Sequence, residues 1–234
     1  MSHRQTLVLL PGMLCDAALW RHQVNTLDDV ADIHVGDLTR HDSIGAMAQA
    51  VLEAVTGPFA LAGLSMGGYV AFEILRRAPE RVTRVALLDT AAHGEPTEGR
   101  RRRAALIDLS RQGRFKGVTP HLLPSLVHPR HENDPTVRDT VLTMAERVGH
   151  AAFERQQRAI MNRPDSTADL PGITRPALVL CGREDAVTPL AVHEEMAAAL
   201  PRAFLVPVED CGHLAPLEQP AAVSAALRLW LQVS

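Results

Sequence analysis

Residues 59–77 of the 234-residue chain read FALAGLSMGGYVAFEILRR. The first part, Phe59–Leu64, is apolar on consecutive positions, which predicts a strand buried on both faces. Residues 66–77 have the composition of a helix, and the turn before them carries the pattern Gly-Leu-Ser-Met-Gly. A serine between two glycines on a sharp strand-to-helix turn is the pattern of a nucleophile elbow. We therefore take Ser65 as the candidate nucleophile.

The chemistry of the elbow depends on its glycines. The turn brings neighbouring backbone so close that a Cβ would collide, and it holds the serine in a strained conformation. Ser65 would then stand at a helix N-terminus, where backbone N–H groups and the helix dipole favour a developing anion. The alternative interpretation is that Ser65 is an ordinary helix N-cap.

Strand and helix patterns alternate along the chain. Short apolar runs predict six strands, and the stretches between them predict helices. Such alternation is typical of an α/β fold, here a mainly parallel six-stranded sheet with helices on both faces. Ligands of such sheets bind beyond the carboxyl ends of the strands, so the residues after each strand are the functional candidates. The predicted strands are Thr6–Leu10, Ile33–Val35, Phe59–Leu64, Val82–Leu88, Ala177–Cys181 and Ala203–Val208, and the predicted helices include Ala17–Leu27, Ile44–Val55, Met66–Arg77, Leu190–Leu200 and Pro220–Leu231.

The alternation stops after the fourth strand and resumes before the fifth. The sequence between them is helical in pattern and rich in arginine, with 13 basic and 10 acidic residues over 95–170. Asp134 is a candidate N-cap with Pro135 at the first helical position. An apolar stripe follows at Val137, Val141, Met144 and Val148. We predict a helical insertion over 95–170 in a core formed by residues 1–94 and 171–234.

A serine hydroxyl is a weak nucleophile until a base takes its proton. His213 is the candidate base, because it follows the last predicted strand and lies downstream of the elbow. Asp185 directly follows the fifth strand and is the candidate acid that orients the imidazole. Asp89, which follows the fourth strand, is the competing acid. We prefer Asp185, and the order along the chain is then serine, aspartate, histidine.

A developing oxyanion needs hydrogen-bond donors. The backbone N–H of Met66, directly after the nucleophile, is the first candidate, and the loop after the first strand would supply the second. In that loop Gly12 permits the turn, and Met13 is the predicted donor. Asp16, at the end of the loop, is interpreted as the N-cap of the next helix.

Taken together, these segments resemble the α/β-hydrolase superfamily, in particular its small bacterial esterases and enol-lactonases. The matching segments are 63–68 for the elbow, 182–189 for the acid loop and 212–220 for the histidine loop, where the sequence reads GHLAPLEQP. The resemblance spans the chain outside 95–170. It implies that 95–170 forms a cap domain over a Ser–His–Asp site.

The chain departs from this family pattern at two places. The oxyanion loop contains Pro11-Gly12, where the family has His-Gly. The first predicted strand corresponds to the family's third, so the initial hairpin is missing and six strands are expected. Neither departure touches Ser65, Asp185 or His213.

Composition excludes several classes of function. The formal net charge is −3 and 3% of the residues are aromatic, which argues against a nucleic-acid binder. No apolar run reaches the length of a membrane span. The apolar part of the N-terminus is too short for a signal peptide, so we expect a cytoplasmic protein. Three cysteines without a CxxC pair argue against a disulfide framework or a thiolate zinc site.

Three further features are interpreted as structural. The runs 128–131 (HPRH) and 193–195 (HEE) lack the spacing of a helical metal site, so we predict no metal and no cofactor. The arginine run Arg100–Arg103 is interpreted as a solvated helix face rather than as a docking site for an anionic substrate. Cys211 is expected to be a small buried side chain rather than a second nucleophile.

These residues predict a serine hydrolase that cleaves a small carboxylic ester or lactone through an acyl-enzyme on Ser65, with Asp185 and His213 completing the triad. The same triad could serve a carbon–carbon bond hydrolase or a lyase, because fold and triad do not fix the substrate. A ligand sensor that keeps the pocket without turnover is the alternative that is not an enzyme. The sequence leaves the acyl group, the alcohol group and the oligomeric state open.

Overall fold

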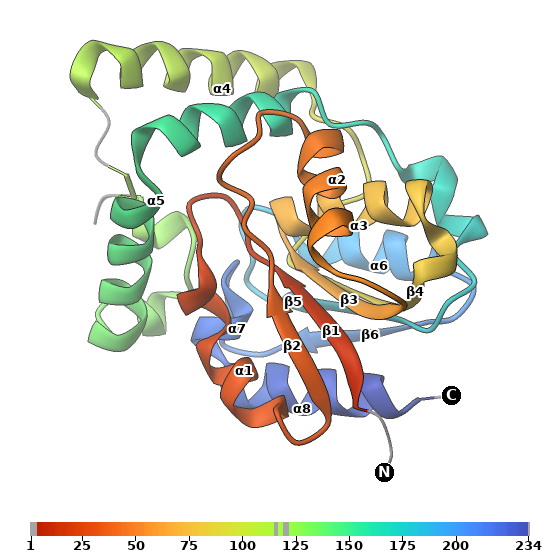
Figure 1. The fold of residues 1–234 in the computed structure, drawn as a ribbon. Coiled ribbons are helices and arrows are strands. Elements are labelled where there is room, and N and C mark those ends of the chain that lie inside the picture. The colour runs from red at the N-terminus through yellow and green to blue at the C-terminus, as the bar shows by residue number, and fades with distance from the viewer. Residues whose placement is uncertain (1–3, 115–116, 119–121, 234) are drawn as a thin grey trace.

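The sheet at the centre of the molecule has parallel strands in the order β2-β1-β3-β4-β5-β6 (Figure 1). The computed structural model describes residues 4–114, 117–118 and 122–233, and the sheet of that part of the chain has six strands. The strands are β1 Gln5–Leu10, β2 Ala31–Val35, β3 Phe59–Leu64, β4 Val82–Leu88, β5 Ala177–Gly182 and β6 Ala203–Val208. The predicted α/β fold is confirmed, and each predicted strand is present with ends shifted by at most two residues.

The chain adds strands on both sides of β1. The next strand in the chain, β2, lies on one side of β1, whereas β3 lies on the other side. The loops that follow β1 and β3 therefore diverge at the carboxyl edge of the sheet. Such a switch point is where open parallel sheets bind their ligands.

Helices cover both faces of the sheet (Figure 1). The helices α2, α3 and α6 lie on one face, and α1 and α8 lie on the other. The helix expected over 17–27 is instead a 3₁₀ turn, Ala17–Trp20, followed by α1. Asp16 caps this turn, as predicted, because its side chain accepts the Ala18 N–H. The bounds are α1 Arg21–Leu27, α2 Ile44–Ala54, α3 Met66–Arg77, α6 Leu190–Ala199, α7 Ala215–Glu218 and α8 Pro220–Gln232.

Successive side chains of a strand pack on opposite faces. In β1, Val8 and Leu10 pack toward α2 and α3, while Leu7 and Leu9 pack toward α1 and α8. All four are buried. Burial on both faces is the reason why the strands appear as continuous apolar runs in the sequence.

Between β4 and β5, the described residues form helices and turns. The two long helices are α4 (Thr97–Leu109) and α5 (Pro135–Met161), and α4 lies alongside the second half of α5 (Figure 1). As predicted, α5 begins with Asp134 accepting the Thr136 N–H and with Pro135 in its first turn. It bends at Gly149, where φ is 75°.

The two halves of α5, on either side of this bend, join different apolar clusters. Residues of the first half join the cluster that contains α1 and α8, and residues of the second half join the cluster that contains α2 and α3. The former are Val137, Val141 and Met144, and the latter are Ala159 and Ile160. Val148, the fourth residue of the predicted stripe, is only half-buried. The bounds of 95–170 as a separate domain stay a prediction.

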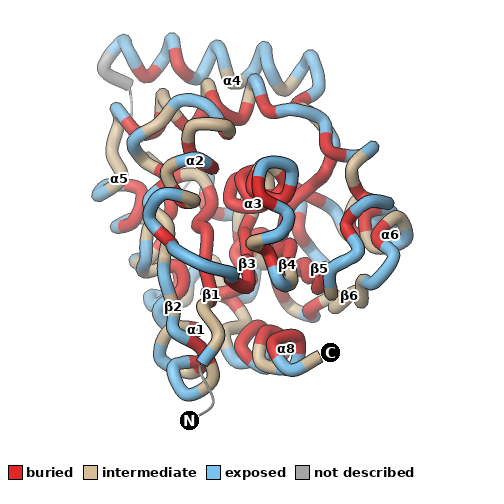
Figure 2. Tube along the Cα trace, turned by 45° about the vertical axis from the view of Figure 1, so that its right-hand side comes forward, coloured by how far each residue is buried: buried red, intermediate tan, exposed pale blue. Residues whose placement is uncertain are grey.

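Figure 2 shows where burial is concentrated. The central strands β1, β3, β4 and β5 and the inner sides of the surrounding helices are mostly buried, whereas the edge strands β2 and β6 are partly exposed. Ile107 is the one buried residue of α4. Across the described ranges, every helix falls short of the length and apolarity that crossing a bilayer requires.

Candidate active site

The turn after β3 holds Ser65 in a conformation that few residues other than glycine adopt, with φ 53° and ψ −115°. A Cβ on Gly63 would lie 2.3 Å from the Gly67 carbonyl oxygen, and a Cβ on Gly67 would lie 2.3 Å from the Leu10 carbonyl oxygen. Both positions therefore require glycine, as the sequence predicts. Ser65 occupies the N-cap position of α3, but its side chain makes no capping bond. The N-cap interpretation of the Ser65 hydroxyl is therefore wrong.

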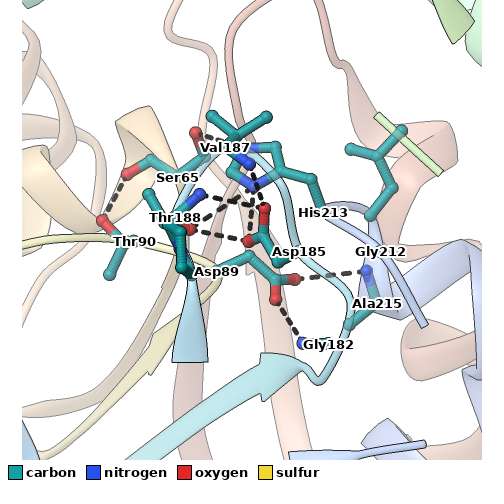
Figure 3. A network of polar contacts seen from close by, with 12 residues as sticks. Ser65, Asp89, Thr90, Gly182, Asp185, Val187, Thr188, Gly212, His213 and Ala215 are labelled. Carbon is teal, nitrogen blue, oxygen red and sulfur yellow. Dashed lines mark hydrogen bonds and ion pairs between the residues drawn. The ribbon is translucent and has the colours of Figure 1, made fainter. Parts of the chain in front are cut away.

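The side chains of Ser65, His213 and Asp185 lie in one hydrogen-bonded line (Figure 3). His213 Nε2 is 3.0 Å from Ser65 Oγ, and His213 Nδ1 is 2.8 Å from Asp185 Oδ2. Because an ionised carboxylate can only accept, Nδ1 carries the ring proton and Nε2 accepts the Ser65 hydroxyl hydrogen. The structure thus brings together three residues that the sequence selects from distant parts of the chain.

The loop after β5 holds the Asp185 carboxylate. It accepts the N–H groups of Val187 and Thr188 at 2.7 and 2.9 Å, and the Thr188 hydroxyl at 2.7 Å. Burial by itself would raise the pKa of Asp185, but the electrostatic attraction and hydrogen bond of His213 and the donors of Thr188 outweigh it and lower the pKa. Asp185 therefore stays ionised beside the imidazole.

Asp89 is buried at the end of β4 and bonds to other groups. Its carboxylate accepts the N–H of Gly182 at 2.9 Å and the N–H of Ala215 at 3.2 Å (Figure 3). These amides belong to the acid loop and the histidine loop, so Asp89 joins the two loops. Burial raises the pKa of Asp89 well above its usual value, and the neighbouring Asp185 carboxylate adds to this rise. Of the two competing acids, Asp185 is the one that bonds to His213.

Glu218, at the end of α7, holds the histidine loop from its other side. Its carboxylate accepts the N–H groups of Gly212 and Leu214, which flank His213, at 3.0 Å each. It also accepts the N–H of His128 at 2.7 Å, so it joins the segment between β4 and β5 to the histidine loop. Burial raises the pKa of Glu218, and the three amide bonds offset part of this rise. In the sequence Glu218 is visible only as a member of the histidine-loop pattern, which does not indicate its partners.

A second buried histidine supports the backbone of the elbow. The Thr90 hydroxyl donates to the Ser65 carbonyl oxygen at 2.8 Å, and the Thr90 N–H donates to His193 Nε2 at 3.0 Å. His193, on α6, is fully buried, and burial lowers its pKa from 6.5 to about 4. It is therefore neutral at ordinary pH and accepts a hydrogen bond through Nε2.

The loop after β1 passes beside the elbow. A Cβ on Gly12 would lie 3.5 Å from the Ser65 Cβ. The Leu14 N–H is occupied, because it donates to Gln156 Oε1 of α5 at 3.0 Å. Within the described ranges no bonded acceptor is found for the N–H groups of Met13 and Met66, which stay the candidate oxyanion donors. Sequence reasoning missed Gln156, because nothing in the pattern of α5 indicates that a buried polar residue reaches this loop.

A cavity of about 100 Å³ opens beside Ser65 and His213. Its lining is mostly apolar and includes Leu14, Leu64, Leu126, Val141, Ile160 and Val187. The side chains of Tyr69 and Arg103 add polar groups to the wall. A wider groove of about 320 Å³ beside β2 and α2 shares no lining residue with this cavity.

The cavity corrects the interpretation of the arginine run. Arg100, Arg101 and Arg102 are exposed, as expected for a solvated helix face. The side chain of Arg103 is only 15% exposed; it pairs with Glu95 and lines the cavity. The sequence does not separate Arg103 from its neighbours, because α4 has no apolar stripe that marks its inner side.

The other candidate ligands are structural. No group of three His, Cys, Asp or Glu in residues 4–114, 117–118 and 122–233 is placed to hold a metal ion. His128 and His131 form hydrogen bonds with backbone groups. Burial raises the pKa of Cys15 and Cys181 to about 12 and also raises that of Cys211. All three cysteines are therefore buried thiols, as expected for Cys211.

Comparison with known sequences identifies relatives along most of the chain. The family model described as "Alpha/beta hydrolase family" matches residues 7–226. Over 230 residues the chain is 26% identical to the pimeloyl-[acyl-carrier protein] methyl ester esterase of Nitrosomonas europaea, which covers 92% of this chain and 90% of that protein.

Solved structures agree with this match. A thermophilic esterase from Thermogutta terrifontis, solved with malate bound, superposes with a TM-score of 0.89 and 30% identity over 98% of this chain and 91% of its own. The enol-lactonase from Burkholderia xenovorans LB400 superposes with a TM-score of 0.88 and 24% identity over 99% of this chain and 93% of its own. Because the family model matches nearly the whole chain, this protein belongs to the alpha/beta hydrolase family.

Proposed function

We propose that this protein is a serine hydrolase that cleaves a carboxylic ester or lactone through an acyl-enzyme on Ser65. The observation that carries the proposal is the line of hydrogen bonds in which His213 joins Ser65 to Asp185, beside an apolar cavity. Two of the similar proteins are named as esterases, which supports an ester as the substrate.

The first half of the reaction forms the acyl-enzyme. Ser65 Oγ attacks the carbonyl carbon while His213 Nε2 takes the hydroxyl proton, and the Asp185 carboxylate stabilises the resulting imidazolium. The carbonyl oxygen becomes an oxyanion that accepts the N–H groups of Met13 and Met66. When the tetrahedral intermediate collapses, His213 gives its proton to the leaving alcohol, and the acyl group stays bonded to Ser65.

The second half restores the enzyme with one water molecule. His213 takes a proton from water, the resulting hydroxide attacks the acyl carbon, and the same two amides bind the oxyanion. Collapse returns the proton to Ser65 Oγ and releases a carboxylic acid. The net change is ester plus water to acid plus alcohol. In a lactone, both products are parts of one molecule.

We further propose that residues 95–170 act as a cap over this reaction. Side chains from this segment, including Arg103, Leu126, Val141 and Ile160, form much of the cavity wall. An apolar cover of this kind excludes bulk water and strengthens the electrostatic interactions inside the site.

The proposal is tested with Ser65→Ala and a fluorophosphonate probe that labels an activated serine. We expect the substitution to abolish labelling and to lower kcat for a 4-nitrophenyl ester by about 10³ to 10⁶. The matched control is Ser43→Ala, because Ser43 is an exposed serine that caps α2 and lies outside the site.

The same assay separates the alternatives. A carbon–carbon bond hydrolase would turn over vinylogous diketones faster than esters, and a ligand sensor would bind small esters tightly without releasing product. An unchanged rate of ester hydrolysis in Ser65→Ala would overturn the acyl-enzyme mechanism.

A further inference from the structure

One wall of the cavity carries polar groups that the proposed reaction does not use. Tyr69, Arg103 and Ile160 line this wall. Tyr69 lies four residues after Ser65 and therefore about one helical turn along α3 on the same side. Its hydroxyl has no hydrogen-bond partner among the described residues. A hydroxyl and a guanidinium thus border the same small cavity as the candidate nucleophile.

Arg103 belongs to a buried ionic cluster with Glu95 and Arg163. Glu95 Oε1 accepts from Arg103 Nε at 2.8 Å, and Glu95 Oε2 accepts from Arg163 Nη1. The side chains of Glu95, Arg103 and Arg163 are 6%, 15% and 4% exposed. Two cations therefore share one anion, which leaves one positive charge in excess. An excess charge in such a buried place is costly unless a counter-charge joins it.

The remaining bonds of the two guanidinium groups go to neutral partners. Arg103 Nη1 donates to Gln157 Oε1 at 2.8 Å, and Arg163 Nε donates to the His93 carbonyl oxygen at 3.1 Å. The Arg163 guanidinium also lies over the Tyr69 ring, 4.3 Å from its centroid. In the part of the chain that the structure describes, Arg103 Nη2 has no partner, so the side chain keeps a free donor.

Tyr69 shares the electrostatic surroundings of this cluster. Burial raises the pKa of Tyr69, and the charges of Arg163 and Arg103 offset part of the rise. The phenol therefore stays protonated at neutral pH and can donate its hydrogen. The hydroxyl is therefore available to donate to a molecule that enters the cavity.

We propose that the substrate carries a small anionic group, such as a carboxylate, and that Arg103 together with the Tyr69 hydroxyl binds this group inside the cavity. The proposal rests on the proposed ester hydrolysis and specifies its substrate class. The N–H groups of a guanidinium and a phenolic hydroxyl donate the charge-assisted hydrogen bonds that a carboxylate accepts. Because Arg103 and Tyr69 line the same cavity as Ser65, the anionic group lies a few bonds from the scissile carbonyl.

The experiment compares esters that differ in charge at nearly the same shape. For the acyl side, the pair is mono-4-nitrophenyl glutarate and 4-nitrophenyl valerate. For the alcohol side, the pair is 4-carboxyphenyl butyrate and 4-carbamoylphenyl butyrate. The readout is the ratio of kcat/KM for the anionic to the neutral ester, because intrinsic reactivity cancels when one pair is compared across variants.

Arg103→Gln is the main variant. It is expected to lower the ratio for at least one pair by about tenfold or more, the usual effect of losing a hydrogen bond to a charged group. Tyr69→Phe removes only the hydroxyl and should lower the same ratio by a smaller factor. Arg102→Gln is the matched control: it removes the same charge from an exposed neighbour on α4 and should leave the ratio unchanged.

A measurement on the unmodified protein covers the case in which Arg103→Gln does not fold. Glutarate should then inhibit hydrolysis of the neutral valerate ester competitively and more strongly than glutaramide. Equal inhibition by the two compounds would overturn the proposal.

The outcomes also separate this proposal from the ester hydrolase on which it depends. If Ser65 is not labelled and the protein hydrolyses none of the four esters, the proposed hydrolase function is wrong. If the neutral esters are hydrolysed and Arg103→Gln and Tyr69→Phe leave both ratios unchanged, only the anion site is wrong. In that case the cluster of Glu95, Arg103 and Arg163 serves to hold α4 and α5 together, and Arg103→Gln lowers stability alone.

Discussion

Asp89 and Asp185 follow adjacent strands and have opposite environments. The Asp185 carboxylate accepts from His213 and Thr188, whereas the Asp89 carboxylate accepts from two backbone amides. Burial acts on both, but the partners of Asp185 lower its pKa and those of Asp89 do not prevent a rise. The bonding partners, rather than the distance from the strand end, therefore decide which acid can serve the imidazole.

This difference predicts how the two acids respond to amide substitution. Asp185→Asn should lower kcat for a 4-nitrophenyl ester by about 10⁴, because an amide no longer holds the imidazole in the tautomer that accepts from Ser65. Asp89→Asn should mainly lower stability, by roughly 1–3 kcal/mol, because an amide has only one oxygen for two buried N–H groups. Steady-state kinetics and urea unfolding of both variants check this. A loss of kcat in Asp89→Asn as large as in Asp185→Asn would reverse the assignment.

At the scale of elements, the strands and the elbow could be predicted because local chemistry determines them. A strand buried on both faces has to be apolar throughout, and Gly63 is required by backbone contacts within its own turn. The convergence of Ser65, Asp185 and His213 follows from the parallel sheet, which puts the carboxyl end of every strand at one edge.

The contacts between distant elements could not be predicted in the same way. Gln156 reaches the Leu14 amide across 142 residues, and Glu218 reaches His128 across 90 residues. Arg103 turns toward the cavity while its neighbours in the same run face solvent. Each of these contacts depends on how α4 and α5 pack on the sheet, and a single sequence holds no periodic pattern for such packing.

The link between α6 and the end of β4 depends on a neutral histidine. His193 of α6 accepts from the Thr90 N–H through Nε2, and its Nδ1 lies 3.3 Å from the Pro189 carbonyl oxygen. A neutral ring with its proton on Nδ1 satisfies both contacts. Protonation of Nε2 would break the bond to Thr90 and would leave a charge in a fully buried site.

This link predicts a pH-dependent stability. The unfolded chain binds a proton at His193 below about pH 6.5, whereas the folded protein does so only near pH 4. The free energy of unfolding should therefore fall as the pH falls through this window, by about 1.4 kcal/mol per pH unit from this residue alone.

Urea unfolding at pH 7.5 and pH 5 measures the effect, with His193→Gln as the comparison because glutamine can accept from Thr90 but does not titrate. Asp89 and Glu218, whose pKa values are raised, contribute slopes of opposite sign to both proteins. Taking the difference between the two proteins at each pH removes these slopes. Between pH 7.5 and pH 5, the free energy of unfolding of the unsubstituted protein should fall by about 2 kcal/mol more than that of His193→Gln. An equal fall in both proteins would show that His193 is not the group that titrates.

At the scale of the whole molecule, the described residues between β4 and β5 are joined to the sheet by apolar and polar contacts. Side chains of this segment belong to both apolar clusters of the sheet, and hydrogen bonds join it to the histidine loop and to Glu218. The Leu126 carbonyl oxygen accepts from the His213 N–H at 2.9 Å, and Glu218 bonds to the His128 N–H. A segment held in this way has few contacts that could open without disturbing the site.

We therefore expect the core and the site to unfold together. Trp20 and Trp230 are fully buried in the cluster beside α1 and α8, so their fluorescence reports the core, while fluorophosphonate labelling of Ser65 reports the site. In urea the two signals should give the same midpoint, as a cooperative transition requires. Glu218→Gln, which has one acceptor oxygen for three buried amides, should shift both midpoints to lower urea by the same amount, corresponding to about 1–3 kcal/mol. If labelling were lost while the tryptophans stayed buried, the segment between β4 and β5 would open as a unit of its own, and the bonds made by Glu218 and His213 would be too weak to couple it to the sheet.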